Sequence, residues 1–311
     1  MESIKPVVEK ESILSLLKET FDLPIQDLTS VEGGLAAQTL SFGAGDDEYI
    51  LRFNPSNFDA SFQKESFIYK NFASPSIPIP PILKVGVFRD LPYAISKKMP
   101  GRGLQSLSKA EYEQTLPSII QTLYAIHHVD VRSWNNYGWI GDNGIGMFSS
   151  WKNFIAKIIE EERPDGFYGK WHTLFQTTFL ERDFFERIYN QMLLLLEFCQ
   201  EERYFVHGEY GYNNVLAENG NVTAVLDWID AMYGDFVYDI AGFDFWSHDT
   251  DFPELFRQYY VSHGVALPDY QERVVCYKYY KGLDALRFFA KTNNREAYQS
   301  TRQILQSLLE I

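Results

Sequence analysis

Apolar residues recur along the chain at two different spacings, one typical of helices and the other of strands. Apolar residues at helical spacing predict an amphipathic helix over 9–21 and a second helix over 61–73. Between and after them, short runs of alternating polarity predict strands over 39–42, 49–53, 85–88 and 93–96. In the second of these strands Tyr49, Leu51 and Phe53 share one face, and Ile50 and Arg52 share the other. Prolines between 75 and 81 exclude a helix there.

The pattern becomes mainly helical beyond Met99. Ser108 and Glu111 form a capping box ahead of a helix predicted over 112–127, which Pro117 is expected to kink or restart. The remaining expectations are helices over 150–162 and 174–199, a polar insertion over 163–172, a strand-like stretch over 204–228, and helices after 236. We therefore expect an α+β fold, with a small N-terminal sheet lobe over 1–99 and a larger, mainly helical C-terminal lobe over 100–311.

Composition narrows the class of protein. The chain has 311 residues, of which 45% are hydrophobic and 16% aromatic, enough for a large core. The net charge of −14 argues against nucleic-acid binding and suits a cationic ligand, although acidity also serves solubility alone. Two cysteines exclude a disulfide framework and a four-cysteine zinc site. No apolar run is long enough for a membrane span and no export signal is evident, so we expect a cytoplasmic protein.

One stretch, 204–239, concentrates the residues that carry chemistry. Asn219-Gly220 predicts a two-residue hairpin turn, which places Glu218 opposite Asn221 and Asn214 opposite Val225. Asp227 lies two residues after Val225 and so shares its face of the strand, which brings Asp227 near Asn214. Oxygen ligands of this type suit Mg²⁺. Taken singly, such residues are more often turn-capping groups.

The spacing of four residues in this stretch resembles a known catalytic loop. His207, Glu209, Asn214 and Asp227 fall where kinase-like phosphotransferases have a His-x-Asp motif, an Asn and a metal-binding Asp. Segments 234–235 and 238–241 resemble those of the aminoglycoside phosphotransferase and choline-kinase-like family. Segments 49–54, 72–75, 77–80 and 222–228 are most similar to its hygromycin B phosphotransferase branch.

This resemblance covers about residues 10–290 and implies a fold and an activity. The fold is a bilobal, protein-kinase-like one. The activity is that of a small-molecule O-phosphotransferase, which moves the γ-phosphoryl group of ATP to a hydroxyl of an aminoglycoside such as hygromycin B or a similar cationic molecule. ATP and Mg²⁺ are the implied cofactors, and the small-molecule acceptor is the only partner implied.

The resemblance also implies roles for residues of the first lobe. Arg52 matches the strand residue that holds phosphates, where most of the family has Lys, and Glu65 is placed to pair with it; the alternative for Glu65 is a surface residue on an amphipathic helix. The other residues implied for the nucleotide are the Gly33 and Gly34 loop and the Ser96, Lys97 and Met99 linker.

In the second lobe, the implied catalytic residues are Glu209, His207 and Asn214, and the implied Mg²⁺ ligands are Asn214 and Asp227. Asp235 and Asp239 are expected to brace the loop. Candidate acceptor contacts are Asn213, Asp244, Trp246 and Asp249, and for Asp244 and Asp249 a solvated loop is the alternative.

Glu209 is the clear departure, since the family has Asp at this position. Its extra methylene makes reduced turnover a possibility, and Glu209→Asp is then expected to raise kcat. It also keeps two alternatives open: another small-molecule kinase of the same fold, for a choline- or homoserine-like acceptor, or a nucleotide-binding pseudokinase.

Overall fold

The structure is a computed structural model that describes residues 5–31, 37–56, 61–164, 166–247 and 250–310. It divides into two compact units, one formed by Met1–Thr115 with Asn213–Ile229 and the other by Leu116–Tyr212 with Asp230–Ile311. This division differs from the expected boundary near Met99. Residues up to Thr115 group with the N-terminal sheet, and so does the hairpin that carries Asn214 and Asp227.

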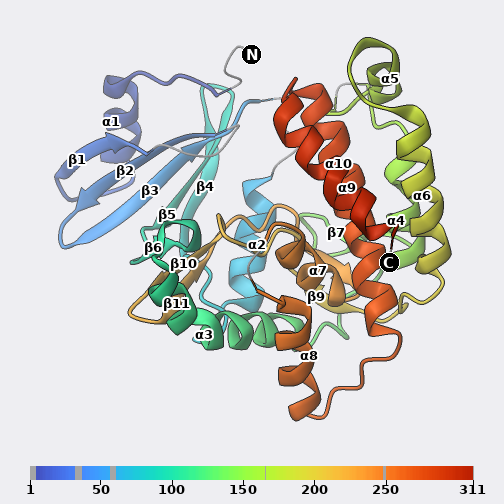
Figure 1. Cartoon of the computed structure of the whole chain (residues 1–311). Helices are drawn as coiled ribbons and strands as arrows, with labels where there is room; N and C mark the ends of the chain where they lie inside the picture. Colours follow the sequence, from blue (N-terminus) through green and yellow to red (C-terminus); the bar gives the residue numbers. More distant parts are fainter. Residues whose placement is uncertain (1–4, 32–36, 57–60, 165, 248–249, 311) are drawn as a thin grey trace. The chain divides into compact units, whose positions relative to one another are not determined.

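The first unit is built on a five-stranded antiparallel sheet (Figure 1). In spatial order its strands are β1 (Ile25–Ser30), β2 (Gln38–Ala44), β3 (Asp47–Phe53), β5 (Leu91–Lys97) and β4 (Ile82–Phe88). The four predicted strands are confirmed and extend further than expected. β1 escaped prediction because its two apolar residues, Ile25 and Leu28, lie three positions apart and so break the alternation typical of a strand, although both pack against the core.

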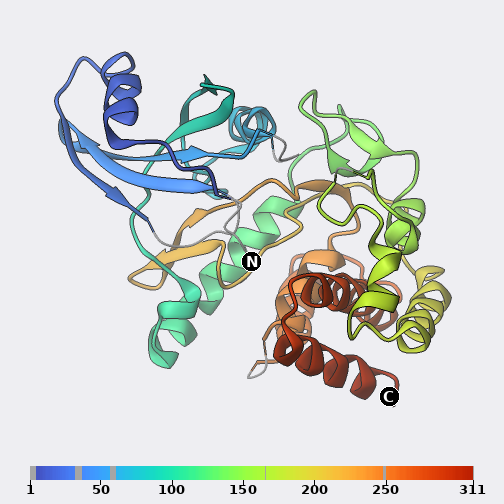
Figure 2. The ribbon, with the colours of Figure 1, turned by 90° about the horizontal axis from the view of Figure 1, so that it is seen from above.

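Two helices pack on this sheet. α1 (Lys10–Lys18) lies beside β1 and β2 (Figure 2) and buries Ile13 and Leu17 in one core with Leu51 and Phe53 of β3. Because side chains alternate across a strand, Arg52 points to the opposite face, where its partner Glu65 belongs to α2 (Phe62–Phe72). The sheet therefore separates an apolar face from the face that carries the candidate phosphate-binding arginine.

The first unit also contains a small three-stranded sheet. Its order is β11 (Asn221–Val225), β10 (Val215–Glu218) and β6 (Arg102–Gly103), and the short helix η1 (Leu104–Ser106) follows β6. The predicted capping box is confirmed at the start of α3 (Lys109–His127). The backbone N–H of Ser108 donates to Glu111 Oε2 at 2.8 Å, and that of Glu111 donates to Ser108 Oγ at 3.4 Å. α3 continues through Pro117 as one helix, so the expected restart does not occur.

The second unit is organised around α9 (Tyr270–Lys291), which packs against α6 (Arg182–Leu196), α7 (Val237–Phe245) and α10 (Arg295–Leu308) (Figures 1 and 2). A four-stranded sheet has the order β8 (Gly146–Phe148), β7 (Tyr137–Ile140), β12 (Met232–Gly234) and β9 (Tyr204–Val206). The other elements are α4 (Trp151–Ala156), η2 (Lys157–Ile159), η3 (Trp171–Thr173), α5 (Leu174–Thr177) and α8 (Phe252–Ser262).

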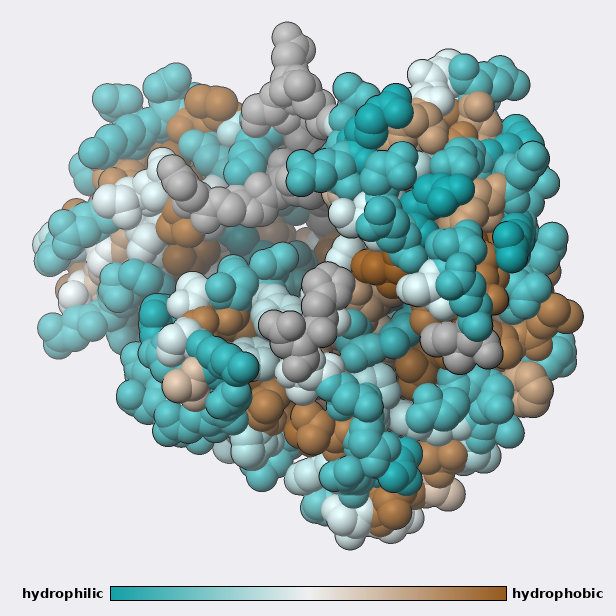
Figure 3. Space-filling view, viewed as in Figure 1, coloured by the Kyte–Doolittle hydropathy of each residue, from teal (hydrophilic) through white to brown (hydrophobic). Residues whose placement is uncertain are grey.

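Two helix predictions in this unit are too long. The helix expected over 150–162 consists of α4 and η2, and the one expected over 174–199 is divided into α5 and α6. Hydrophilic residues cover much of the face drawn in Figure 3. None of the helices in the described ranges combines the length and the apolar character needed to cross a bilayer.

Candidate functional site

Arg52 and Glu65 form a two-point ion pair in the first unit. Arg52 Nη1 donates to Glu65 Oε1 at 3.1 Å and Nη2 donates to Oε2 at 2.5 Å. The side chains are 23% and 10% exposed, respectively, and the guanidinium lies 5.0 Å from the centre of the Phe62 ring. The expected pairing of these two residues is therefore confirmed, and the fork geometry orients Arg52 as a single-point contact would not.

The charge on Arg52 is reinforced by its surroundings. Burial lowers its pKa, but the carboxylates of Glu65 and Asp227 raise it and prevail, so the pKa lies above its usual value. Asp227 is thus close enough to act electrostatically on Arg52 within the same unit. A cation with this setting suits phosphate oxygens.

The hairpin that carries Asn214 and Asp227 has a different register from the predicted one. Glu218 pairs with Asn221, as expected, but Val225 lies opposite Val215 and not Asn214. The register shifts between Leu216 and Ala217, which pair with Ala224 and Val222, so Thr223 is the additional residue. Its hydroxyl donates to the Pro100 carbonyl at 2.6 Å.

This bulge changes how Asn214 and Asp227 are brought together. The backbone N–H of Leu226 donates to the Asn214 carbonyl at 2.7 Å, so Asn214 lies beside the residue that precedes Asp227. The expected convergence on one end of the hairpin holds for the backbone. It arises from a bulged register, not from the regular ladder that the sequence suggested.

Asp227 is exposed and has a left-handed backbone, with φ of 59°. Asp is one of the few residues that tolerate this conformation. The following Trp228 is 2% exposed, and its Nε1–H donates to the Val225 carbonyl at 2.9 Å. Buried Lys64 donates to the Ile229 carbonyl. The chain on the C-terminal side of Asp227 is therefore anchored while the carboxylate stays accessible.

Asn214 and Asp227 are the residues of this hairpin that could hold a magnesium ion. Within the described ranges, no group of three or more His, Cys, Asp or Glu side chains could hold a metal ion. Mg²⁺ typically takes one or two protein ligands and completes its shell with water and substrate phosphates. An amide oxygen from Asn214 and a carboxylate from Asp227 meet that requirement.

The segment expected to contact a purine begins at the end of β5. Ser96 is 7% exposed, while the side chain of Lys97 is exposed and pairs with Asp47 at 2.9 Å. The backbone N–H of Lys97 donates to the Pro81 carbonyl at 2.8 Å. Met99 is half-buried. The other residues predicted for the nucleotide, Gly33 and Gly34, lie outside the described residues.

In the second unit, Asp239 holds the loop that carries the candidate catalytic residues. Its Oδ2 accepts the backbone N–H of His207 and its Oδ1 accepts that of Gly208, both at 2.8 Å. The backbone N–H of Glu209 donates to His207 Nδ1 at 3.1 Å. Buried His207 thus shapes the loop, and Glu209, 49% exposed, is presented at its surface.

Gly208 is required by this loop. It has φ of 91°, and a Cβ added there would lie 2.4 Å from the carbonyl oxygen of Asp230. A side chain at this position would therefore be strained and would displace the backbone beside Glu209.

Asp239 is itself held in place by a buried chain of polar groups. It is 1% exposed, and its Oδ2 lies 3.0 Å from His127 Nε2, while His127 Nδ1 lies 2.5 Å from the hydroxyl of Tyr260. Burial raises the pKa of Asp239, but the interactions with His127 and His207 lower it and prevail. The expectation that Asp239 braces the loop is confirmed. The contribution of His127 had no sequence signal.

Asp235 is the second expected bracing residue. Its Oδ2 accepts from Arg273 Nε at 2.9 Å and its Oδ1 accepts from Arg273 Nη2 at 2.5 Å. The hydroxyl of Tyr277 also donates to Oδ2, at 2.7 Å. Asp235 therefore anchors the start of α7 to α9, and in this way it supports the element that carries Asp239.

The candidate acceptor contacts have different settings. Asp244 is paired with Lys278 and only 13% exposed, so it is not the open carboxylate that the sequence suggested for an amine. Trp246 is 46% exposed and Asn213 is exposed. Asp249 lies outside the described residues.

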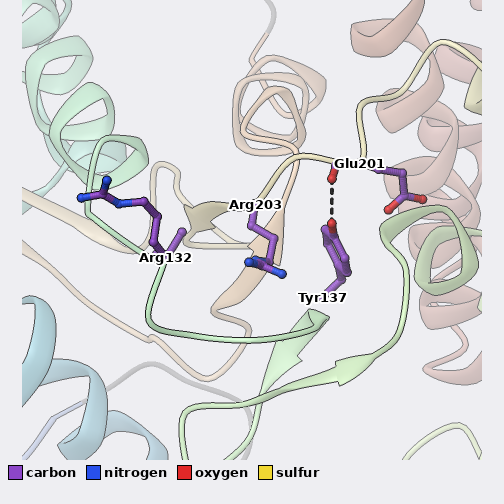
Figure 4. Close-up of a pocket in the computed structure, with 5 residues that line it drawn as sticks. Arg132, Tyr137, Glu201 and Arg203 are labelled. Carbon is purple, nitrogen blue, oxygen red and sulfur yellow. Dashed lines mark hydrogen bonds between the residues drawn. The ribbon is translucent and has the colours of Figure 1, made fainter.

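Two hollows in the surface contain none of the predicted site residues. One, of about 210 Å³, belongs to the second unit (Figure 4), where the hydroxyl of Tyr137 donates to the Glu201 carbonyl at 2.7 Å. Arg132 at its rim is committed to Asp130, at 2.6 Å. The other, of about 440 Å³, belongs to the first unit and is lined partly by the ion-paired Arg102 and Glu111. The candidate site therefore rests on the residues described above and not on a hollow.

The sequence is similar to known phosphotransferases. Residues 27–273 match the model of a phosphotransferase enzyme family. The hygromycin-B 4-O-kinase of Escherichia coli is 34% identical over 243 residues, which cover 78% of this chain and 68% of that enzyme. These matches confirm the expected family.

Solved structures extend the likeness to nearly the whole chain. Aminoglycoside phosphotransferase APH(4)-Ia is 28% identical, with a TM-score of 0.82 over 97% of this chain and 99% of that one. A thermostable mutant of it, in a ternary complex with AMP-PNP and hygromycin B, is 29% identical, with a TM-score of 0.82 over 96% and 98% of the two chains. Aminoglycoside 2'-phosphotransferase-IIIa, at 14% identity, has a TM-score of 0.64 over 97% and 98%. The expected α+β, protein-kinase-like fold is confirmed.

Proposed function

Because the chain belongs to the phosphotransferase enzyme family, we propose that it transfers the γ-phosphoryl group of ATP to a hydroxyl of an aminoglycoside of the hygromycin B type. The observation that carries this proposal is the loop in which Asp239 fixes two backbone amides and Glu209 remains exposed. Two similar proteins, a hygromycin-B 4-O-kinase and an APH(4)-Ia mutant crystallised with AMP-PNP and hygromycin B, support the choice of donor and acceptor.

The proposed nucleotide contacts come from the first unit. Arg52, oriented by Glu65, would bind the phosphate oxygens of ATP. The backbone N–H groups of Lys97 and Lys98 already donate to the carbonyls of Pro81 and Glu48, so the proposed purine contact is the backbone of Met99. Gly33 and Gly34 remain predicted loop residues over the phosphates.

Asn214 and Asp227 are the proposed ligands of Mg²⁺. When bound there, Mg²⁺ would neutralise charge on the phosphates. The protein's own part is to supply an amide oxygen just before β10 and a carboxylate oxygen just after β11, the two strands of one hairpin.

The proposed reaction is a single displacement. The acceptor hydroxyl oxygen forms a bond to the γ-phosphorus as the bond from phosphorus to the bridging oxygen of ADP breaks. The hydroxyl proton passes to the carboxylate of Glu209, which then releases it to solvent. The products are ADP, a phosphorylated acceptor and a proton, and catalysis consists mostly of positioning and electrostatics. His207 takes part indirectly, because it receives the Glu209 N–H at 3.1 Å.

A substrate panel tests the proposal. ADP release should be measured with hygromycin B, other aminoglycosides, choline and homoserine, and the phosphorylated product identified by mass spectrometry. We expect turnover with hygromycin B or a related aminoglycoside. Turnover with choline or homoserine alone would assign the enzyme to another small-molecule kinase class. Thermal stabilisation by ATP with no turnover on any acceptor would identify a pseudokinase.

A further inference from the structure

A buried lysine on α9 contacts the loop that presents Glu209. Lys281 is 6% exposed, and its Nζ donates to the Gly208 carbonyl at 2.5 Å and to Glu209 Oε1 at 3.1 Å. These contacts join residues 72 or more positions apart in the chain, all within the second unit. The ammonium thus holds one oxygen of the candidate catalytic carboxylate and, at the same time, the backbone of the preceding residue.

Lys281 and Glu209 differ in how far their side chains are exposed to solvent. The Lys281 side chain is 7% exposed, whereas that of Glu209 is 49% exposed. An exposed ion pair holds neither partner firmly, because both side chains move and water screens their charges. Here the cation is fixed by packing, so the pair restrains the carboxylate and not the reverse.

Packing around the lysine explains how it is fixed. Its Nζ lies 4.4 Å from the centre of the Tyr238 ring, and its Cε would lie 3.0 Å from a Cβ added to Gly242. Both residues belong to α7, the helix that also supplies Asp239. Gly242 therefore gives the lysine stem room to pass α7 and reach the loop.

The charged groups that face Lys281 keep it cationic. Burial lowers its pKa, but Glu209, Asp230 and Asp239 raise it and prevail, so the pKa lies above its usual value. Removing one of these carboxylates would destabilise the protein, because a buried ammonium with too few counter-charges is strongly unfavourable. The site therefore requires both the lysine and the carboxylates around it.

Asp239 and Lys281 divide the support of the loop between them. Asp239 fixes the amide N–H groups of His207 and Gly208. Lys281 fixes the Gly208 carbonyl and, in addition, the side chain of Glu209. A glutamate has one more rotatable bond than an aspartate, so its carboxylate needs an anchor if it is to meet an acceptor hydroxyl in a defined position.

We propose that Lys281 is a positioning residue for phosphoryl transfer, which anchors the longer carboxylate of Glu209 at the place where the acceptor hydroxyl gives up its proton. This inference rests on the proposed function. It assigns Lys281 no contact with ATP or with the acceptor: its effect is transmitted through Glu209. The replacement of the usual Asp by Glu is then accommodated by a compensating cation on α9.

Steady-state kinetics with ATP and hygromycin B test this role in the full-length enzyme. Lys281→Met should lower kcat by about 10²-fold, the loss typical of a misplacement near 1 Å, while the KM for ATP changes by less than about twofold. Lys281→Arg, which keeps the cation, should recover part of kcat. In a Glu209→Gln background, Lys281→Met should cause little further loss, because the residue acts through the carboxylate.

Lys152→Met is the matched control. Lys152 is a half-buried lysine of the second unit with the same kinds of partner: it donates to the backbone carbonyl of Glu197 at 3.0 Å and pairs with the carboxylate of Glu197 at 3.7 Å. This variant should keep the parent kcat. If Lys281→Met does not fold, Lys281→Arg carries the test. Its kcat should then lie below that of the parent but above that of Glu209→Gln, with an unchanged KM for ATP.

The outcomes separate the two proposals. A parent enzyme with no turnover on any aminoglycoside refutes the proposed function and the premise of this inference. An active parent whose kcat is unaffected by substitution of Lys281 refutes the positioning role alone. An equal fold-loss from Lys281→Met in the parent and in the Glu209→Gln background also refutes it, because the lysine would then act on the fold in general.

Discussion

Asp239 accepts the backbone N–H of His207 at 2.8 Å, so a carboxylate of α7 fixes the shape of a loop 32 residues earlier in the chain. The same carboxylate contacts His127 Nε2 at 3.0 Å, which connects the loop to α3. The loop geometry is therefore set by two helices, α7 and α3, before any substrate binds. Such pre-organisation is what positioning catalysis demands.

Replacing Asp239 by Asn should destabilise the enzyme and nearly abolish activity. An amide cannot accept hydrogen bonds at both of its ends, so it cannot receive the N–H groups of both His207 and Gly208. Breaking a buried charged network typically costs about 3–5 kcal/mol. Urea unfolding should show this loss, whereas Asp142→Asn, at an exposed position of the same unit, should change the free energy of unfolding by less than about 0.5 kcal/mol. Equal stability of both variants would contradict the bracing role.

The same residue predicts an acid dependence of stability. The folded-state pKa of Asp239 is lowered below its usual value, with His127 and His207 facing the carboxylate. Its contribution to stability is therefore present above the unfolded-state pKa, about 3.9, and is lost as pH falls through the folded-state pKa. The difference in unfolding free energy between the parent and Asp239→Asn should shrink as pH falls below about 4. A difference that stays constant to about pH 2 would show that this carboxylate is not the source.

The Arg52–Glu65 pair predicts a defect in nucleotide binding. Arg52→Lys replaces the forked guanidinium, which makes two contacts with Glu65, by an ammonium that acts as a point charge. We therefore expect the KM for ATP to rise by about tenfold, which corresponds to about 1.4 kcal/mol. Arg102→Lys is the control, since Arg102 pairs with Glu111 in the same unit and is 57% exposed. If both variants keep the parent KM for ATP, Arg52 does not bind phosphate.

The hairpin shows which parts of the site could be predicted from the sequence. Asn219-Gly220 fixes the turn locally, so the pairing of Glu218 with Asn221 was predictable. The register beyond it was not, because no local signal marks the bulge at Thr223, whose hydroxyl contacts the distant Pro100 carbonyl. β12 was missed for a similar reason, since three residues form a strand there only through pairing with β7 and β9.

Lys281 marks the limit of prediction from sequence. It lies within a long helical pattern, where a lysine is normally read as a solvated residue, yet it is buried against Gly208 and Glu209. No local spacing connects it with a loop 72 residues earlier. By contrast, the pairing of Arg52 with Glu65, 13 residues later in the chain, was implied by the resemblance to the family.

Asp227→Asn should remove most of the magnesium-dependent part of ATP affinity. Asn tolerates the left-handed backbone at φ of 59°, so this change removes the charge without straining the turn. Ala would strain it. Calorimetric titration of ATP with and without Mg²⁺ measures the effect, which we expect to be at least about tenfold. Asp90→Asn, an exposed residue with φ of 66° in the same unit, is the matched control. Identical magnesium dependence in Asp227→Asn and the parent would refute the ligand assignment.

Glu209→Asp gives the sharpest test of how the loop is adapted. The sequence alone favoured a rise in kcat, because Asp is the usual family residue. The structure reverses this expectation, since Glu209 Oε1 lies 3.1 Å from a buried Lys281 that cannot follow a shorter side chain. Losing one methylene withdraws the carboxylate by about 1.5 Å, beyond hydrogen-bond reach of Nζ.

We therefore expect Glu209→Asp to lower kcat by about 10–100-fold with little change in the KM for ATP, because misplacement near 1 Å has effects of that size. Glu209→Ala should lower kcat further, and Glu197→Asp, in a side chain that is 82% exposed and paired with Lys152, should leave it unchanged. A higher kcat in Glu209→Asp would mean that the loop is still adapted to Asp and that Lys281 restrains a misplaced carboxylate. Equal kcat values in the parent, Glu209→Asp and Glu209→Ala would remove Glu209 from the chemistry altogether, and the acceptor proton would then have to leave by another route.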